Sequence, residues 1–269
     1  MSRNSLFNGI AEQLDAGLSN DTGFAEPFRV HYFKPFTDDL YQAILNHLPD
    51  NKFYGHLMHR ELVQPDGTST RLGLSLTDER IEALPDPQKT FWRELTHVLK
   101  GPEVRAVFLK HLAPQLTARF NAPVDQIPLH SSPVLFRDLA GYKLSPHPDS
   151  PQKVCTIQVY LPSDDSDVQL GTSVYRRLED GSMELSRTLE YRPNTAYCFT
   201  VTDNSWHGNP FWDFKKPRNS LMLTYYRVPA GPFNLKYQSA DSALPEQPVE
   251  GPQLEHVERS HSYKAHNDE

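Results

Sequence analysis

Residues 141–161 read Gly-Tyr-Lys-Leu-Ser-Pro-His-Pro-Asp-Ser-Pro-Gln-Lys-Val-Cys-Thr-Ile-Gln-Val-Tyr-Leu, and they place a histidine–aspartate pair directly before an apolar run. His147 and Asp149 are two positions apart, so in an extended segment both side chains point to the same face. The run from Val154 to Leu161 has the composition of a buried strand. The stretch therefore predicts β structure that carries two potential ligands of one metal ion.

Short strand-like segments separated by turn residues continue through residues 131–228. Turns are expected at residues 163–166 and 179–181, where Ser, Asp, Glu and Gly cluster. This alternation is typical of a β-sandwich or a barrel. The strands are expected near residues 133–138, 142–147, 154–161, 169–176, 182–190, 195–200 and 219–228.

The amino-terminal part, approximately residues 1–130, is expected to form helices that support one sheet. Apolar residues recur there at helical spacing, and Thr, Asp and Pro stand where helices begin. A short strand is expected within residues 27–36, whereas residues 52–76 show no pattern that supports an assignment. The helices are expected at residues 5–18, from Thr37 to Leu48, after Asp86-Pro87 and after Gly101-Pro102.

The chain length of 269 residues fits one domain, because barrels often reach this size without a second domain. We therefore expect residues 1–269 to form a single domain whose β core occupies residues 131–228. Residues 229–269 are polar and contain several prolines, and we expect a loose extension there.

Two further parts of the pattern lie beyond the apolar run. His207, in Asp-Asn-Ser-Trp-His-Gly at 203–208, follows His147 by 60 positions, so several strands can form before the chain returns. Two imidazoles and one carboxylate leave coordination positions open, which suits non-haem Fe(II) enzymes that bind oxygen and a second ligand. Arg218 and Ser220 follow at positions that share one strand face. The guanidinium there can form a bidentate pair with a carboxylate.

The histidine–acid spacing alone is weak evidence, because the chain has 12 histidines and 34 acidic residues. The same spacing occurs at His59, His256 and His266, where no strand-like run with a correctly spaced His and Arg follows. We interpret these three sites as solvated surface. The context of His147 is what distinguishes it.

The order His-x-Asp, a distant His and then Arg-x-Ser resembles that of the Fe(II)/2-oxoglutarate-dependent oxygenases. The resemblance extends over residues 133–228 and includes Tyr-Leu-Pro at 160–162 and Leu-Gly-Thr-Ser at 170–173. It implies a mainly β fold with flanking helices, in which a double-stranded β-helix of the jelly-roll or cupin type forms the catalytic core at residues 131–228. It also implies Fe(II) as the cofactor, with 2-oxoglutarate and O2 as co-substrates.

The same resemblance implies a role for each residue of the pattern. His147, Asp149 and His207 would bind iron, and Arg218 with Ser220 would hold the far carboxylate of 2-oxoglutarate. Because the carboxylate Asp149 is retained, halogenation is disfavoured. The strands beside the metal motif carry further candidates, each of which could instead be structural. Tyr142 and Gln158 are assigned to the co-substrate, and the candidates for contact with the substrate or for support of the site are Arg137, Tyr160, Thr156 and Trp206.

The composition disfavours several other classes of protein. A net charge of −7 argues against a nucleic-acid-binding surface. Cys155 and Cys198 lie in apolar patterns and are too few for a disulfide framework or a zinc cluster. The sequence contains no recognisable targeting segment or membrane span, so we expect a cytoplasmic protein.

Three functions remain open at this point. The favoured one is a hydroxylase of a small molecule, such as an amino acid, a sugar or a biosynthetic intermediate, which releases succinate and CO2. The second carries out the same chemistry on a protein side chain or a glycan. The third is a cupin-type metal-binding protein that does not use 2-oxoglutarate. The sequence predicts neither the identity of the substrate nor the oligomeric state.

Overall fold

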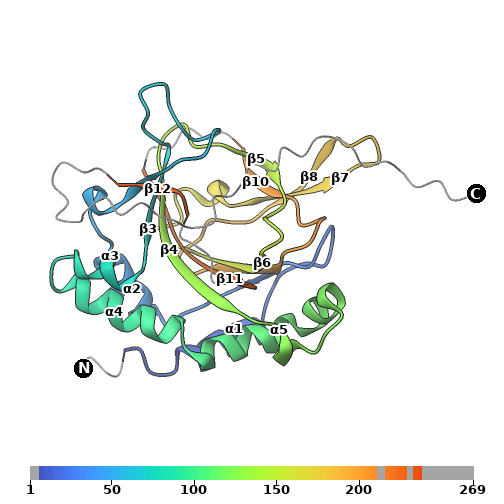
Figure 1. The fold of residues 1–269 in the computed structure, drawn as a ribbon, viewed down its shortest axis with the longest axis horizontal. Helices are drawn as coiled ribbons and strands as arrows, with labels where there is room; N and C mark the ends of the chain where they lie inside the picture. The colour runs from blue at the N-terminus through green and yellow to red at the C-terminus, as the bar shows by residue number, and fades with distance from the viewer. Residues whose placement is uncertain (1–5, 211–215, 229–232, 238–269) are drawn as a thin grey trace, which may run out of the picture.

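Two antiparallel β-sheets face each other in the computed structural model, which describes residues 6–210, 216–228 and 233–237 (Figure 1). In order across the sheet, the eight strands of the larger one are β1 (His31–Phe33), β9 (Ala196–Thr200), β6 (Lys153–Tyr160), β11 (Arg218–Tyr226), β4 (His130–Asp138), β3 (Arg71–Ser75), β2 (Gly55–Leu57) and β12 (Leu235–Lys236). The four strands of the smaller one are β5 (Leu144–His147), β10 (His207–Asn209), β7 (Ser173–Arg177) and β8 (Met183–Thr188).

From β4 to β11 the chain passes back and forth between the sheets. β4, β6, β9 and β11 lie side by side in the larger sheet, and β5, β7, β8 and β10 make up the smaller one. Such a double-sheet arrangement of antiparallel strands is a jelly roll. The predicted jelly-roll core with flanking helices is therefore confirmed.

The central strand β6 shows how the sequence separates the two faces of the larger sheet. Its odd-numbered residues Cys155, Ile157 and Val159 belong to the apolar core on the helix side. From Thr156 onward its even-numbered residues point to the opposite face, because side chains alternate along a strand. Tyr160 accordingly packs in a second apolar cluster, between the two sheets. Polar residues at even positions of β6 thus enter the interior of the barrel.

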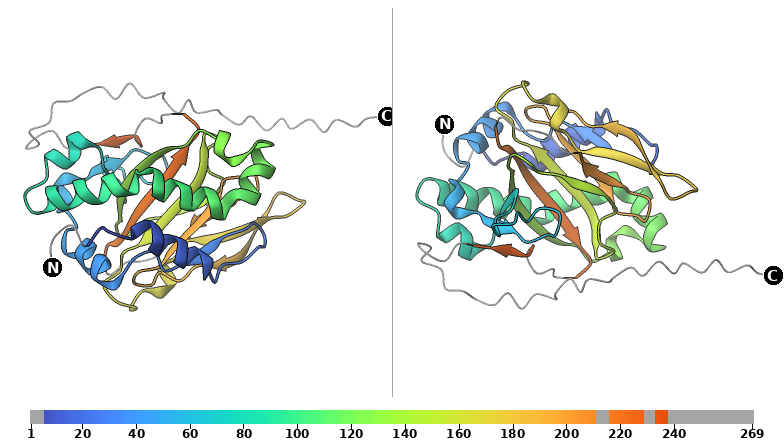
Figure 2. Two further views of the ribbon diagram at one scale, coloured as in Figure 1. Left: turned by 90° about the horizontal axis from the view of Figure 1, so that it is seen from below. Right: turned by 90° about the horizontal axis from the view of Figure 1, so that it is seen from above.

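Helices cover the outer face of the larger sheet, as Figure 2 shows from below. Thr37 caps α2 as predicted, with its side-chain oxygen 3.3 Å from the amide nitrogen of Leu40. Trp92 of α4 is completely buried and donates from its indole nitrogen to the carbonyl of His47 at 2.7 Å. The helices are α1 (Ile10–Ser19), α2 (Asp38–Asn46), α3 (Asp78–Glu82), α4 (Gln88–Leu99) and α5 (Pro102–Phe120).

Residues 1–130 supply the helices and also three strands, of which β1 lies within the strand expected at residues 27–36. β1, β2 and β3 extend the larger sheet, and the last two lie in the unassigned stretch 52–76. All five residues of β3 are buried, and the alternation of Leu72 and Leu74 with Arg71, Gly73 and Ser75 is too short to identify a strand within a polar stretch. The prediction also missed β10, which has three residues and includes His207. Strands this short leave too few positions for a period to be recognised.

The extension 229–269 is described only at residues 233–237, where β12 pairs with β2. The triplets that begin at His256 and His266 lie outside the described residues. The single-domain assignment of residues 1–269 stays a prediction.

Candidate metal centre

The two histidines of the predicted triad meet at the junction of two neighbouring strands. His147 is the last residue of β5 and His207 the first of β10, and the two are direct partners across this antiparallel pair. The strands approach closely because residue 208 is glycine, where a Cβ would lie 2.6 Å from the carbonyl oxygen of Leu144. Asp149 follows two residues after β5. One ligand atom from each of the three side chains lies within 4.8 Å of the others.

Both imidazoles are oriented in the same way. Nδ1 of His147 lies 2.8 Å from the carbonyl oxygen of Ser145, and Nδ1 of His207 lies 2.9 Å from that of Ser205. Since a carbonyl only accepts hydrogen bonds, Nδ1 carries the hydrogen in each ring. The lone pair is then on Nε2, the usual arrangement for a histidine that binds a metal.

The carboxylate of Asp149 is held at both oxygens. Thr156 on β6 donates from its hydroxyl to Oδ2 at 2.7 Å, and this oxygen lies 3.9 Å from Nε2 of His207. Lys153, also on β6, donates from its ammonium group to Oδ1. Thr156, a candidate from the sequence, therefore contacts a potential ligand. Lys153 was not singled out in the sequence, although it is the first residue of β6 and follows Asp149 by four positions.

Burial and charge fix the protonation of these groups. Burial lowers the pKa of His147 to about 4, with a further contribution from the neighbouring His207. Burial also lowers the pKa of His207, against the opposing effect of Asp149. Burial alone would raise the pKa of Asp149, but Lys153 and the two imidazoles outweigh it, and the pKa falls well below its usual value. At neutral pH the triad thus presents two neutral imidazoles and one carboxylate.

We expect the metal-free protein to lose stability as the pH falls from about 6.5 to about 4. In this window the unfolded chain protonates His147, whereas the folded chain keeps it neutral because its pKa is about 4. The unfolded state then binds more protons, so the free energy of unfolding rises with pH, by up to about 3 kcal/mol for this residue. Urea denaturation at a series of pH values measures the slope. His147→Gln should reduce it, and an unchanged slope in that variant would contradict the assignment.

Arg218 enters the barrel interior from the first position of β11, where it is 1% exposed. Its Nη1 donates to Oδ2 of Asp138 at 2.6 Å and its Nε to the carbonyl oxygen of Leu170 at 2.6 Å. The rings of Tyr160 and Tyr191 each lie 5.3 Å from the guanidinium carbon. Burial would lower the pKa of Arg218, but the attraction of the Asp138 carboxylate is stronger than this effect, and the pKa is raised. The guanidinium is permanently charged and held in place.

A second buried arginine, which the sequence analysis missed, shares the same aspartate. Arg71 on β3 donates from Nε to Oδ1 of Asp138 at 2.6 Å and from Nη2 to Oδ2 at 3.2 Å. Its guanidinium carbon lies 4.6 Å from the ring centres of both Phe136 and Tyr142. Two guanidinium groups and one carboxylate leave one positive charge in the barrel. Tyr142, assigned to the co-substrate, contacts Arg71.

A hydrogen-bonded row of side chains connects Arg218 with the middle of the barrel. Nη2 of Arg218 lies 3.4 Å from the hydroxyl of Thr172, which donates to the hydroxyl of Tyr197 at 3.1 Å. Tyr197 donates to Oε1 of Gln158 at 2.6 Å, and Nε2 of Gln158 donates to Ser220 at 2.7 Å. The row brings together three residues that the sequence assigned to the co-substrate: Arg218, Ser220 and Gln158.

The remaining candidates lie in different places. The hydroxyl of Tyr160 accepts a hydrogen bond from the amide of Thr172 inside the barrel, at 2.8 Å. Arg137 is on the opposite face of β4, where it donates to Asn219 at 2.8 Å and contacts the ring of Tyr54, so it is corrected to a structural residue. Its neighbour Asp138 faces inward, and adjacent strand residues point to opposite faces. Trp206 stands next to His207, and the guanidinium carbon of Arg177 lies 5.5 Å from its ring centre.

The triad suits a divalent transition metal with open coordination positions. Two neutral imidazole nitrogens and one carboxylate oxygen on one face form the donor set typical of non-haem Fe(II) sites. No helix among the described residues combines the length and apolar composition that crossing a bilayer requires.

No protein-family model matches this chain, and no curated protein matches it. It is similar to a prolyl-4-hydroxylase from Pseudomonas putida, with 12% identity over 81% of this chain and 99% of that one and a TM-score of 0.48. It is also similar to an oxidoreductase of the 2OG-Fe(II) oxygenase family from Burkholderia pseudomallei, with 11% identity over 86% and 92% and a TM-score of 0.43. The non-heme alpha ketoglutarate dependent epimerase SnoN from nogalamycin biosynthesis gives 15% identity over 90% and 96%, with a TM-score of 0.43. At these identities and TM-scores, the activity of the chain has to be argued from its own residues.

Proposed function

We propose that this chain is an Fe(II)- and 2-oxoglutarate-dependent oxygenase, and that it hydroxylates a small molecule with release of succinate and CO2. The observation that carries the proposal is the meeting of His147, Asp149 and His207 at one point, with both imidazoles turned to offer Nε2. A buried positive charge in the same barrel supports the use of an acidic co-substrate.

Different residues of the chain would bind the metal, orient its ligand and bind the co-substrate. His147, Asp149 and His207 would hold the iron, which when bound supplies the site where O2 and the keto acid meet. Lys153 and Thr156 fix the carboxylate of Asp149, so the third ligand is already oriented. Arg218, with Ser220 and Gln158 behind it, would bind the far carboxylate of 2-oxoglutarate. Burying that carboxylate without a cation would be costly, so the guanidinium is a physical requirement.

Arg71 makes the positive charge available to a ligand. Asp138 neutralises one guanidinium group, and the carboxylate of a bound co-substrate would neutralise the second. The interior would then hold two arginines and two carboxylates. This balance favours 2-oxoglutarate over a neutral ligand in the barrel.

Removal of Arg218 tests the co-substrate assignment. We expect Arg218→Met to weaken 2-oxoglutarate binding by roughly a hundredfold, as the loss of a buried charge pair does, with metal affinity retained. Arg71 still pairs with Asp138 in this variant, so the fold keeps a partner for the buried aspartate. Calorimetric titration of the Co(II)-loaded protein measures both affinities. Arg137→Met, which removes a guanidinium from the opposite face of the neighbouring strand β4, is the control. Unchanged 2-oxoglutarate affinity in Arg218→Met would favour the cupin-type alternative.

The rate of succinate release, measured with different added compounds, distinguishes a small-molecule substrate from a macromolecular one. A panel of amino acids, sugars and biosynthetic intermediates is compared with lysate protein and glycan, and stimulation by the macromolecules alone would reject the small-molecule proposal.

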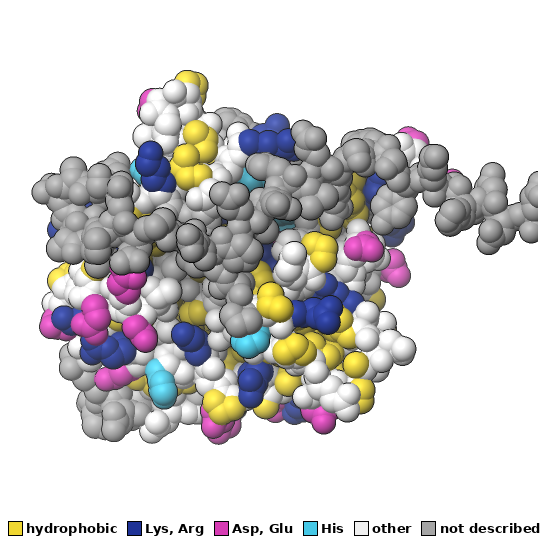
Figure 3. Space-filling model, in the orientation of Figure 1, with side chains coloured by type: hydrophobic (Ala, Val, Ile, Leu, Met, Phe, Trp, Pro, Cys, Tyr) yellow, Lys and Arg dark blue, Asp and Glu magenta, His cyan; other side chains and the backbone are white. Residues whose placement is uncertain are grey.

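We further propose a cytoplasmic location, since Cys155 and Cys198 are both free and buried. Nucleic acid is not a proposed partner: on the face shown in Figure 3, basic and acidic side chains are interspersed.

A further inference from the structure

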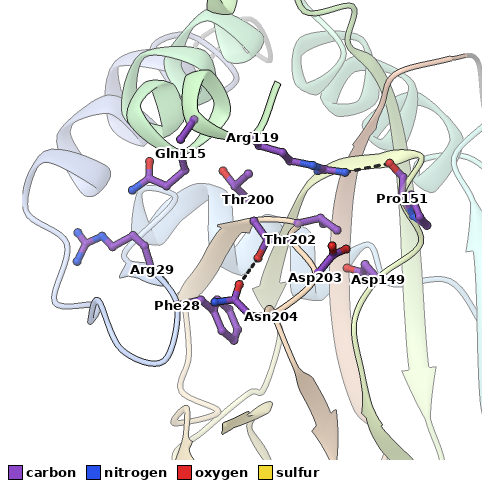
Figure 4. Close-up of a pocket in the computed structure, with 12 residues that line it drawn as sticks. Phe28, Arg29, Gln115, Arg119, Asp149, Pro151, Thr200, Thr202, Asp203 and Asn204 are labelled. Atoms are coloured by element: carbon purple, nitrogen blue, oxygen red, sulfur yellow. Dashed lines mark hydrogen bonds between the residues drawn. The ribbon is translucent and has the colours of Figure 1, made fainter. Parts of the chain in front are cut away.

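A cavity of about 650 Å³ adjoins the metal centre on the side of α5. Its walls are the last turns of α5, the segment around Phe28, and the chain that follows β9, and Asp149 lies at one end (Figure 4). Its size suits a small organic molecule. A molecule in this cavity would lie directly beside a metal ligand.

Arg119 is the cation in the wall nearest to the metal centre in Figure 4. Nη1 donates to the carbonyl oxygens of Lys153 at 2.7 Å and Val154 at 3.0 Å, and Nη2 donates to that of Pro151 at 2.9 Å. All three acceptors are uncharged, and among the described residues no carboxylate accepts a hydrogen bond from this guanidinium. The side chain is therefore rigid, and its charge has no direct counter-ion.

A second arginine adds positive charge at this point. The guanidinium carbons of Arg119 and Arg227 lie 4.6 Å and 5.3 Å from the ring centre of Phe120. Burial lowers the pKa of Arg119, and Arg227 lowers it further. An anion beside Arg119 would relieve this unfavourable concentration of charge.

The acidic residues of the wall do not cancel this charge. Asp149 is paired with Lys153, and Arg29 at the far end of the cavity is paired with Asp21 at 2.8 Å. Asp203 remains as an acidic residue of the wall, and its charge acts on Arg119. Arg227 does not line the cavity but adds its charge beside Arg119, so two guanidinium groups and one carboxylate act at this end, which leaves one positive charge.

Two buried polar atoms of the wall have no hydrogen-bond partner in the described structure. They are Oε1 of Gln115 and the hydroxyl oxygen of Thr200, whose residue is 4% exposed. Gln115 precedes Arg119 by one helical turn, so the two side chains lie on the same face of α5. Oε1 of an amide only accepts hydrogen bonds. The wall therefore offers a cation and, one turn away, an acceptor that requires a donor.

We infer that this cavity binds the substrate of the reaction, and that the substrate is a small carboxylic acid with a hydroxyl or amino group near the carboxylate. The carboxylate lies on Arg119, and the hydroxyl or amino group donates to Gln115, with Thr200 as a second partner. The other end of the molecule is directed to Asp149 and the metal. This inference rests on the proposed function, because it takes the cavity to hold the molecule that is oxidised.

Benzoate and benzamide test the requirement for a negative charge, since they have the same shape and differ in charge. We expect benzoate to bind the metal-free protein about tenfold more tightly than benzamide, in titrations followed by NMR. Benzoate should remain bound when 2-oxoglutarate is added, because the cavity lies outside the barrel. Equal affinity for the two probes, or displacement of benzoate by 2-oxoglutarate, would overturn the inference.

Variants of α5 locate the bound probe. Ala118 is an exposed residue of the cavity wall, so Ala118→Glu adds a carboxylate there with little risk to the fold. We expect Ala118→Glu to weaken benzoate binding about tenfold, whereas the neutral Ala118→Gln binds within about twofold of the unmodified protein. Arg119→Gln should abolish the preference for benzoate over benzamide. A preference that survives Ala118→Glu and Arg119→Gln would place the probe elsewhere.

The two proposals can fail separately. If the unmodified protein binds no 2-oxoglutarate, the proposed function fails, while the benzoate titrations still report on the cavity. If Arg119→Gln keeps full affinity for Co(II) and 2-oxoglutarate but loses the benzoate preference, both stand. If the benzoate preference is absent while 2-oxoglutarate binds normally, the inference about the substrate alone is wrong.

Discussion

Asp149→Ala should lower the affinity of the protein for Co(II) or Fe(II) by about a thousandfold and abolish turnover. The variant removes one of three ligands and also leaves the ammonium group of Lys153 buried beside the metal without its partner. An uncompensated buried charge of this kind costs about 3–5 kcal/mol, and it would repel a divalent cation. Calorimetric titration with Co(II) measures the affinity without any need for a known substrate.

The control for this variant is Asp180→Ala, which removes an exposed turn carboxylate and should leave metal affinity unchanged. Thermal unfolding of the metal-free Asp149→Ala protein then shows whether the fold survives. If the variant is folded and binds Co(II) within tenfold of the unmodified protein, the triad does not hold the metal.

Asp138→Asn should destabilise the protein by about 3–5 kcal/mol, although it changes no side-chain volume. Asp138 is completely buried between Arg71 and Arg218, so its neutralisation leaves two guanidinium groups without a counter-charge in the barrel. Urea denaturation monitored by circular dichroism measures the loss. The matched control is Asp164→Asn, whose exposed carboxylate lies 3.2 Å from Lys216 and whose replacement should change the stability little, because solvent screens exposed ion pairs. A similar, small loss in both variants would mean that the carboxylate of Asp138 is not the counter-charge that stabilises the two guanidinium groups.

The sequence predicted the jelly roll because its central strands have a regular pattern. In β6, from Cys155 to Tyr160, a polar or aromatic residue at each even position alternates with an apolar residue at each odd one, and both faces of this strand are covered. The triad was also predictable, because His147 and Asp149 adjoin that strand and His207 is followed by Arg218. The spacing together with the strand-like context identified these residues, and the convergence of the two histidines follows from the pairing of β5 with β10.

Arg71 could not be identified in the same way. Its strand is buried at every position, and its partner Asp138 is 67 positions away, so neither periodicity nor spacing connects the two. The prediction that Arg137 lies at the site was wrong for a related reason. Whether a residue of β4 faces the barrel or the helices depends on strand register, and a shift of one residue reverses every side chain. The cavity beside Asp149 is likewise absent from the sequence, since α5 and the chain after β9 meet only in the folded protein.

The contact between Lys153 and Asp149 separates folding from metal acquisition. In many small metalloproteins the ligands repel one another or remain unpaired until the ion binds, so the apoprotein is unfolded. Here the ammonium group already compensates the carboxylate, and the backbone already orients both imidazoles. The polypeptide can therefore reach its native state first and bind a metal ion later. A chelator should strip the ion and leave an intact protein that is ready to be reloaded.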